Sequence, residues 1–265
     1  MSRTFALLGI LASLGLPMET LASAADPPVT GETRATRITY PIRFTEDRIK
    51  IDGELTEEAW HRAEPIPLDY EWFPGNNVVP PVVTQAYVVF DTKNIYVAFR
   101  CEDPNPARIR AHYMDRDQVE DLVRDDHVLV QFDTFDDQRR AFQFRVNPLG
   151  VQADAIYSDV GGIEDFSWDM IWTSAGSITD SGYVVEAAFP LNQLRLPAGK
   201  QSQVWGIDLG RSYPRNVRHR ISNAMRNRND ACQICQWNKI SGLENLDPGR
   251  NLELDPTLTG IRTDE

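Results

Sequence analysis

The chain has 265 residues and carries 39 Asp and Glu against 27 Lys and Arg, which gives a formal net charge of -12. A composition that is 42% hydrophobic and 9% aromatic is sufficient for a buried core, which excludes a disordered chain. The acidic balance argues against a nucleic-acid partner, because phosphate binding depends on clustered Lys and Arg, and a charged content of 25% excludes a polytopic helical membrane protein.

The N-terminus has the pattern of a secretory signal peptide. Arg3 supplies a positive charge, residues 5–16 are an apolar run, and Ala22-Ser23-Ala24 is a small-residue cleavage site. The apolar run is too short for a transmembrane span across ~30 Å of hydrocarbon. We predict residues 1–24 as a cleaved signal peptide and residues 25–37 as a flexible leader rich in Pro, Thr and Gly. The protein is then exported to the periplasm, the outer membrane or the extracellular space.

Beyond residue 38 the sequence predicts short strands joined by turns. A short helix at residues 56–60, N-capped by Thr56, is followed by hairpins at 83–90 with 95–101 and at 127–135 with 140–147. Strands at 151–157, 171–178, 183–189 and 204–210 follow. Alternating apolar and polar residues between closely spaced turns are typical of a sandwich. We expect one all-β domain over residues 38–260, a jelly-roll-like antiparallel β-sandwich with one or two short helices, and a tail at 261–265.

Three cysteines are present, two of them as Cys232-Gln-Ile-Cys235. In an oxidising compartment this pair predicts a disulfide that closes a tight loop. A thioredoxin-like redox motif would need a βαβ context, and a zinc site would need ligands that the neighbouring sequence lacks. Cys101 lies in an apolar run and is predicted to be a small buried core residue.

Five segments carry a family pattern in a fixed order. They are I-K-I-D-G-E-L-T-E-E-A-W at residues 49–60, the hairpin at 87–99, D-D-H-V at 125–128, F-R-V-N-P-L-G at 144–150, and G-Y-V-V-E at 182–186 with Pro190. Together they resemble the carbohydrate-binding module family 9-like domains. The resemblance implies a β-sandwich that binds a poly- or oligosaccharide without cleaving it and that serves carbohydrate catabolism through partner enzymes.

Further segments at residues 194–197, 205–206, 241–244 and 248–250 are similar to uncharacterised bacterial outer-membrane proteins in which such a domain precedes a β-barrel. This similarity implies an outer-membrane β-barrel or a glycoside hydrolase as a partner.

The resemblance also implies a binding site, because the family grips its ligand between two tryptophans with Arg, Glu and amide groups nearby. Trp72, in a loop after the helix, resembles the first platform, and Arg100 resembles its polar partner. Asn147 and Trp168 or Trp172 resemble the other side. Arg100 could instead pair with Glu102 or Asp103, and Asn147 could instead serve the turn before Pro148. Trp60 and Trp205 are predicted to be core residues.

Acidic residues crowd the stretch from 115 to 126. An oxygen-rich loop in an exported protein suggests calcium, and the family resemblance implies structural calcium as well. The candidate ligands are Asp115, Asp117, Asp125 and Asp126. A solvated charged loop is the alternative, since the EF-hand pattern is absent.

The sequence lacks the known catalytic patterns G-x-S-x-G, H-E-x-x-H and the P-loop, and it indicates no pair of carboxylates across a cleft. Glu186, an acid in an apolar strand, is predicted to be a buried strut that is hydrogen-bonded or salt-bridged. We therefore expect a protein that is not an enzyme. The alternative function is an envelope module that binds a protein or an anionic polysaccharide through an arginine-rich stretch. That stretch contains Arg211, Arg215, Arg218, His219, Arg220, Arg226 and Arg228, which could instead pair with the surplus carboxylates.

Overall fold

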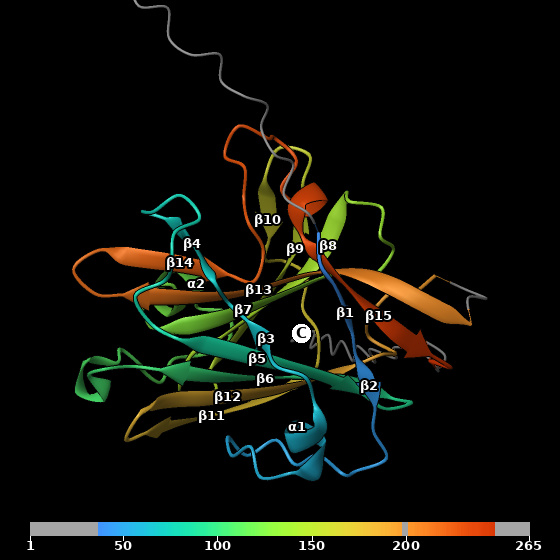
Figure 1. The fold of residues 1–265 in the computed structure, drawn as a ribbon, viewed down its shortest axis with the longest axis horizontal. Helices are drawn as coiled ribbons and strands as arrows, with labels where there is room; N and C mark the ends of the chain where they lie inside the picture. Colours follow the sequence, from blue (N-terminus) through green and yellow to red (C-terminus); the bar gives the residue numbers. More distant parts are fainter. Residues whose placement is uncertain (1–36, 198–200, 247–265) are drawn as a thin grey trace, which may run out of the picture. The chain divides into compact units, whose positions relative to one another are not determined.

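The computed structural model describes residues 37–197 and 201–246. The predicted signal peptide, nearly all of the leader, and the tail lie outside the described residues. Within them, fifteen strands form two sheets that face each other, as Figure 1 shows. The short helices are α1 (Glu58–Arg62) and α2 (Val119–Leu122), with single 3-10 turns at Pro106–Arg108 and Ile234–Gln236. The predicted all-β sandwich is confirmed.

The nine-stranded sheet, here called sheet 1, contains seven strands along one path and two strands beside it. The order is β1 (Thr39–Pro41), β15 (Asn238–Glu244), β13 (Ser202–Pro214), β7 (His127–Asp133), β8 (Arg140–Val146), β9 (Gln152–Ser158) and β10 (Ile163–Asp165). The strand β14 (Arg218–Ser222) also pairs with β13, and β4 (Tyr70–Phe73) pairs with β14.

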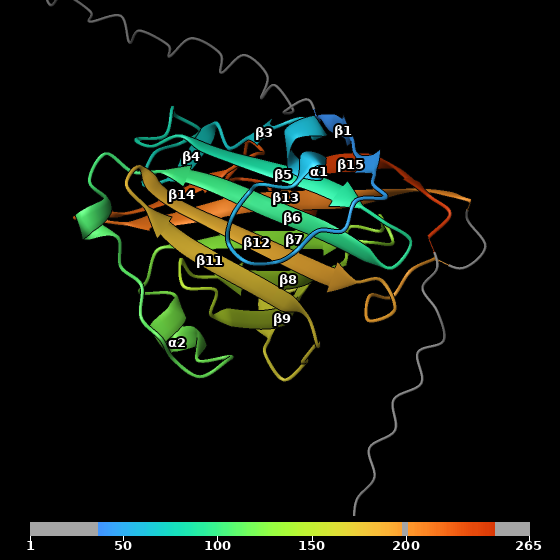
Figure 2. The same ribbon diagram turned by 90° about the horizontal axis from the view of Figure 1, so that it is seen from below.

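The six-stranded sheet, here called sheet 2, has the order β11 (Thr173–Thr179), β12 (Gly182–Pro190), β6 (Asn94–Glu102), β5 (Thr84–Phe90) and β2 (Arg43–Phe44), with β3 (Ile66–Pro67) also on β5. Figure 2, which is turned by 90° from Figure 1, shows its long strands from below. Most pairings are antiparallel, as predicted, but β1 with β15 and β2 with β5 are parallel. The strands with period-2 alternation were predictable, whereas the two- to five-residue strands β1 to β4, β10 and β14 are too short to show that alternation.

Aromatic side chains fill the space between the sheets. Phe144 and Phe189 lie with ring centroids 4.3 Å apart, and Trp172 stacks on Phe189 at 5.1 Å. Trp205 is fully buried beside Phe132, so its predicted core role is confirmed. Burial of these rings is the main stabilising contribution, since free energy follows the apolar area removed from water.

A second, smaller cluster lies where α1 covers the outer face of sheet 2. Trp60 is 3% exposed there, and its Nε1 donates to Glu186 Oε1 at 2.8 Å, which confirms both predicted roles. The predicted N-cap was wrong: Glu57 holds that position, and no side chain caps the helix. Because α1 is only five residues long, the tie from Trp60 to sheet 2 determines its position more than capping does.

Candidate functional site

Sheet 1 turns one face to the core and the other outward, because side chains alternate along a strand. On β7, Val128 and Val130 are core residues, whereas Leu129 and Gln131 point outward. The register places Gln131 beside Gln143 of β8. On its other side Gln131 lies opposite Asp208 of β13, and Leu129 lies opposite Arg145 and Gly210. The pairing thus builds rows of polar residues across the outer face.

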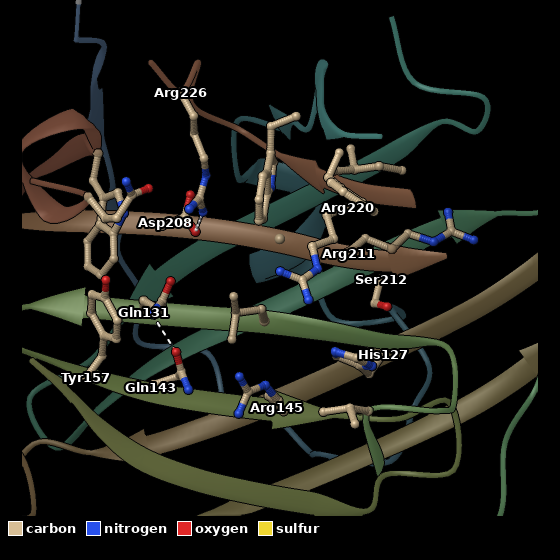
Figure 3. Close-up of a pocket in the computed structure, with 18 of the residues that line it drawn as sticks. His127, Gln131, Gln143, Arg145, Tyr157, Asp208, Arg211, Ser212, Arg220 and Arg226 are labelled. Carbon is tan, nitrogen blue, oxygen red and sulfur yellow. Dashed lines mark hydrogen bonds and ion pairs between the residues drawn. The ribbon is translucent and has the colours of Figure 1, made fainter. Parts of the chain in front are cut away.

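This outer face is hollowed into a cavity of about 740 Å³, shown in Figure 3. We call it the arginine pocket. Its lining includes Trp72, His127, Gln131, Gln143, Arg145, Tyr157, Glu164, Asp208, Ser212, Arg218, Arg220, Arg226, Arg228 and Trp237. Its size falls within the range of ~300–1,000 Å³ that is usual for ligand sites.

A hydrogen-bonded network fixes the floor of the pocket. Gln131 Nε2 donates to Gln143 Oε1 at 2.6 Å, and Gln143 Nε2 donates to Glu164 Oε1 at 2.8 Å. Arg145 Nη2 donates to the same Glu164 oxygen at 2.6 Å. These contacts settle which end of each amide is oxygen, so the floor offers hydrogen-bonding groups in fixed positions.

Trp72 forms part of the wall with two arginines over its ring. The guanidinium carbon of Arg226 lies 4.5 Å from the ring centroid, and that of Arg220 lies 5.3 Å away. Arg226 also pairs with buried Asp208 at 2.6 Å. Arg228 donates to the backbone carbonyls of Trp72, Pro74 and Gly75. The cations hold the indole in place through its π face.

Two members of the arginine-rich stretch serve the fold. Arg211 sends its guanidinium away from the pocket, toward sheet 2, where it donates to Thr84 Oγ1 and the Glu102 carbonyl at 2.9 Å each. Arg215 pairs with the buried carboxylates of Asp103 and Asp126. The expected pairing with carboxylates is therefore correct for Arg215, and Arg226 also has such a partner.

The remaining arginines make the pocket electropositive. Burial, followed by the charge of Arg145, lowers the pKa of His127 to about 3, and Arg218 and Arg220 lower it further. His127 is therefore neutral at pH 7. Burial and then its neighbours Arg218, Arg145 and Arg226 also lower the pKa of Arg220. Like charges are crowded here, and a buried anion would relieve their repulsion.

Trp72 is the one predicted ligand-contact tryptophan of the described chain that lines the pocket, and it lies in β4 instead of the predicted loop. The loop was a wrong prediction because four residues pair with β14 without a readable alternation. Trp172 is 5% exposed, and its Nε1 donates to Asp154 Oδ2 at 2.7 Å. Trp168 packs on Phe142 at 5.1 Å, on the core side. Sheet 1 separates both from Trp72.

Arg100 and Asn147 also lie away from the pocket. Arg100 is exposed on β6, between the core residues Phe99 and Cys101, and therefore on the outer face of sheet 2. Its suggested partner Asp103 binds Arg215 instead. Asn147 is fully buried, and its Oδ1 accepts from the backbone N–H groups of residues 149 and 151 at 3.0 Å each, which is the turn role.

The candidate calcium ligands are dispersed. Asp125 binds the backbone N–H and Nδ1 of His112, and Asp126 binds Arg215. Asp117 pairs with Arg116, whereas Asp115 is exposed. No three acidic, His or Cys side chains of the described residues gather in a group that could hold a metal ion. The four candidate side chains therefore do not form one cation-binding group among the described residues, because Asp117, Asp125 and Asp126 each contact a protein partner.

Cys232 and Cys235 form a disulfide in the structure, and Gln233 between them lines the pocket. Cys101 is buried and free, in the predicted core position. None of the helices in residues 37–197 and 201–246 has the length and apolar character that crossing a bilayer requires.

The floor residues Gln131, Gln143 and Tyr157 were not predicted as site residues, and Trp72 and the arginines were not predicted to share one site. A partial signal for the floor exists: Gln131 and Asp133 on β7, and Gln143 and Arg145 on β8, are polar residues two positions apart in largely apolar strands. The meeting of β4 and β14, which joins Trp72 to Arg220, has no such local signal.

The chain matches the profile of the carbohydrate family 9 binding domain-like family over residues 51–231. A family 9 carbohydrate binding module from Caldicellulosiruptor kristjanssonii in complex with cellotriose is 14% identical, with a TM-score of 0.56, covering 82% of this chain and all of that one. One in complex with glucose is 16% identical, with a TM-score of 0.54 and the same coverage. A Bacteroides uniformis protein is 11% identical, with a TM-score of 0.62, covering 78% of this chain and 99% of its own.

These structures share the fold with this chain. No curated protein sequence matches it. The family profile spans more than half of the chain and includes both Trp72 and the arginines of β14. The chain belongs to the carbohydrate family 9 binding domain-like family.

Proposed function

We propose that this protein is a non-catalytic carbohydrate-binding domain that holds a poly- or oligosaccharide in the arginine pocket. The observation that carries the proposal is the combination of an aromatic wall with hydrogen-bonding groups fixed in the floor. A pyranose presents an apolar C–H face and a ring of hydroxyls, and such a lining complements both. The family and its solved members with cellotriose and glucose support the proposal.

Trp72 and Tyr157 are the aromatic contacts in this proposal. Trp72 is half-buried and held by Arg226, so little side-chain entropy remains to be lost on binding. Tyr157 is also half-buried and stacks on Trp237 at 6.3 Å. The second platform is therefore Tyr157, since Trp168 and Trp172 lie behind sheet 1.

Binding occurs without cleavage. The two carboxylates among the described pocket residues, Glu164 and Asp208, each pair with an arginine at 2.6 Å. A glycosidase needs one carboxyl group to deliver a proton and a second one free to act on the sugar or on water. Carboxylates committed to Arg145 and Arg226 are unsuited to either role.

The proposal also includes export of the protein and a partner that acts on or transports the glycan. The signal-peptide pattern at residues 1–24 and the Cys232–Cys235 pair support an oxidising compartment. There the domain would concentrate glycan for a glycoside hydrolase or for an outer-membrane β-barrel.

Calorimetric titration of the purified protein with cello-, xylo-, chito- and galacturonate oligosaccharides tests the function. We expect saturable heat with one class, with affinity about 10-fold weaker in Trp72→Ala and unchanged in Tyr113→Ala, an aromatic that is 82% exposed and does not line the pocket. Far-UV circular dichroism checks that both variants fold. Absence of heat with every class would refute the proposal.

A further inference from the structure

We propose that the saccharide of the arginine pocket is anionic: a pyranose bearing a carboxylate or a sulfate, which Arg218 and Arg220 bind. This inference rests on the proposed function, because it names the class of saccharide for that same site.

The charge of the pocket is the first argument. Among the described residues, five arginine side chains point at the pocket or form its rim, once Arg211 is set aside, and they face two carboxylates. This positive excess lies in a chain whose formal net charge is -12. A cleft with one sign of charge focuses the field and raises the local concentration of the opposite ion. A neutral glycan carries no charge with which this positive potential could interact.

The second argument is that the guanidinium donors of Arg218 and Arg220 are available to a ligand. Arg145 is committed to Glu164 and Arg226 to Asp208, and Arg228 donates to three backbone carbonyls. Within residues 37–197 and 201–246, neither Arg218 nor Arg220 has an ion pair or a side-chain hydrogen bond, and the Arg220 guanidinium lies over the Trp72 and Phe73 rings, contacts that leave its N–H donors unused. A guanidinium has five N–H donors in a planar fork that matches an oxyanion. These two side chains therefore retain their full donor capacity for a ligand.

The position of these donors is the third argument. Arg218 and Arg220 are two residues apart on β14, and so they share a face, with Arg220 opposite Ser212. Ser212 in turn lies opposite His127. Figure 3 shows Arg220, Ser212 and His127 toward one end of the pocket and Tyr157, Gln131 and Gln143 toward the other. The pocket thus has a cationic end for the oxyanion and an amide and aromatic end for the hydroxyls and a sugar face.

Repulsion among the arginines also favours binding of the oxyanion at the cationic end of the pocket. Burial is the largest cause that lowers the pKa of Arg220, and Arg218, Arg145 and Arg226 lower it further, so the cations repel one another in the absence of a ligand. An oxyanion placed among them replaces that repulsion with charge-assisted hydrogen bonds, which are stronger than neutral ones.

Paired ligands test the inference. Tetragalacturonate is titrated beside its fully methyl-esterified counterpart, and a sulfated galactan oligosaccharide beside its desulfated counterpart, so that carboxylate and sulfate sources are separated. Cellotetraose and polyglutamate serve as a neutral sugar and a polyanion without sugar. The variant is Arg218→Gln with Arg220→Gln. Its control is Arg43→Gln with Arg62→Gln, which removes the same two charges from side chains that are 64% and 61% exposed beside sheet 2.

We expect one charged oligosaccharide to bind at least about 10-fold more tightly than its neutral counterpart, since hydrogen bonds to a charged group are stronger than those between neutral groups. The Arg218→Gln/Arg220→Gln variant removes this preference, whereas the control pair keeps it. Equal binding of charged and neutral partners, or binding of polyglutamate as tight as that of the sugar, would overturn the inference. If the inference is overturned in this way but cellotetraose binds tightly, the proposed carbohydrate-binding function still holds. If no saccharide binds, both the inference and the proposed function are refuted.

Discussion

Glu186 of β12 holds the distant I-D-G motif, residues 51–53, in place through hydrogen bonds to its backbone. Its Oε2 accepts from the backbone N–H groups of Asp52 and Gly53 at 3.1 and 2.8 Å, and its Oε1 accepts from Trp60 at 2.8 Å. Gly53 has a φ of 86° and lies close to the backbone of Gly176, where a side chain would not fit. One buried carboxylate thus ties α1 and its preceding loop to sheet 2.

We predict that Glu186→Gln lowers the free energy of unfolding by about 2–3 kcal/mol. The amide oxygen can still accept from Asp52 and Gly53, but the amide NH2 then meets the N–H of Trp60. One charge-assisted hydrogen bond is lost, and a buried donor is left without an acceptor, which costs ~1–3 kcal/mol. The side-chain volume hardly changes, so no cavity contributes.

Urea unfolding followed by far-UV circular dichroism measures this effect. The control is Glu54→Gln, the same chemical change at an exposed position in the same loop, which is expected to stay within ~0.5 kcal/mol of the natural protein. A Glu186→Gln protein as stable as the control would refute the reasoning.

The same carboxyl group makes a pH-dependent contribution. Burial raises the pKa of Glu186 above its ordinary value of 4.5, against the three N–H donors that lower it. The folded state then holds the proton more tightly than the unfolded chain does. The associated stability is fully present below pH 4.5 and is lost as the pH rises through the folded pKa. Glu186→Gln cannot titrate, so the stability difference between the natural protein and this variant shrinks over that rise.

Three further predictions concern a close backbone contact, the disulfide and the pocket wall. A Cβ at Gly176 would lie 2.5 Å from the carbonyl oxygen of Pro148, so we expect Gly176→Ala to lower the free energy of unfolding by at least ~2 kcal/mol in urea, and an unchanged midpoint would contradict the structure. The double variant Cys232→Ser/Cys235→Ser opens a short loop, and we expect it to lower the free energy of unfolding by about 2 kcal/mol. Reductant should lower the melting temperature of the natural protein for the same reason. Identical melting temperatures with and without reductant would contradict this prediction. Trp72→Ala weakens oligosaccharide binding about 10-fold in calorimetry while Trp72→Phe keeps most of it, and equal affinity in all three proteins would exclude the platform role.

The parts of the fold that sequence could predict are those with a local signal. The hairpin of β5 and β6 and that of β7 and β8 carry period-2 alternation between turn residues. Glu186 could be identified as a buried strut because a lone acid in an apolar strand needs partners. Trp60 could be assigned to the core because it lies on the apolar side of a short helix.

The site depends on information that no local pattern holds. Trp72 and Arg220 are far apart in the sequence and meet only because β4 pairs with β14, with an irregular register at that point. Trp168 and Trp172 precede β11, so strand alternation could not assign them to a face of sheet 1. Arg100 lies in the predicted strand 95–101, but the alternation does not say which sheet that strand joins, and the structure places it in sheet 2.

The central claim is that the arginine pocket of sheet 1 holds the ligand, and a crystal structure with bound tetragalacturonate tests it most directly. The account predicts electron density for the sugar between Trp72 and Tyr157, with a carboxylate within hydrogen-bonding distance of Arg218 or Arg220. Density for the sugar at Arg100, on the outer face of sheet 2, would contradict it.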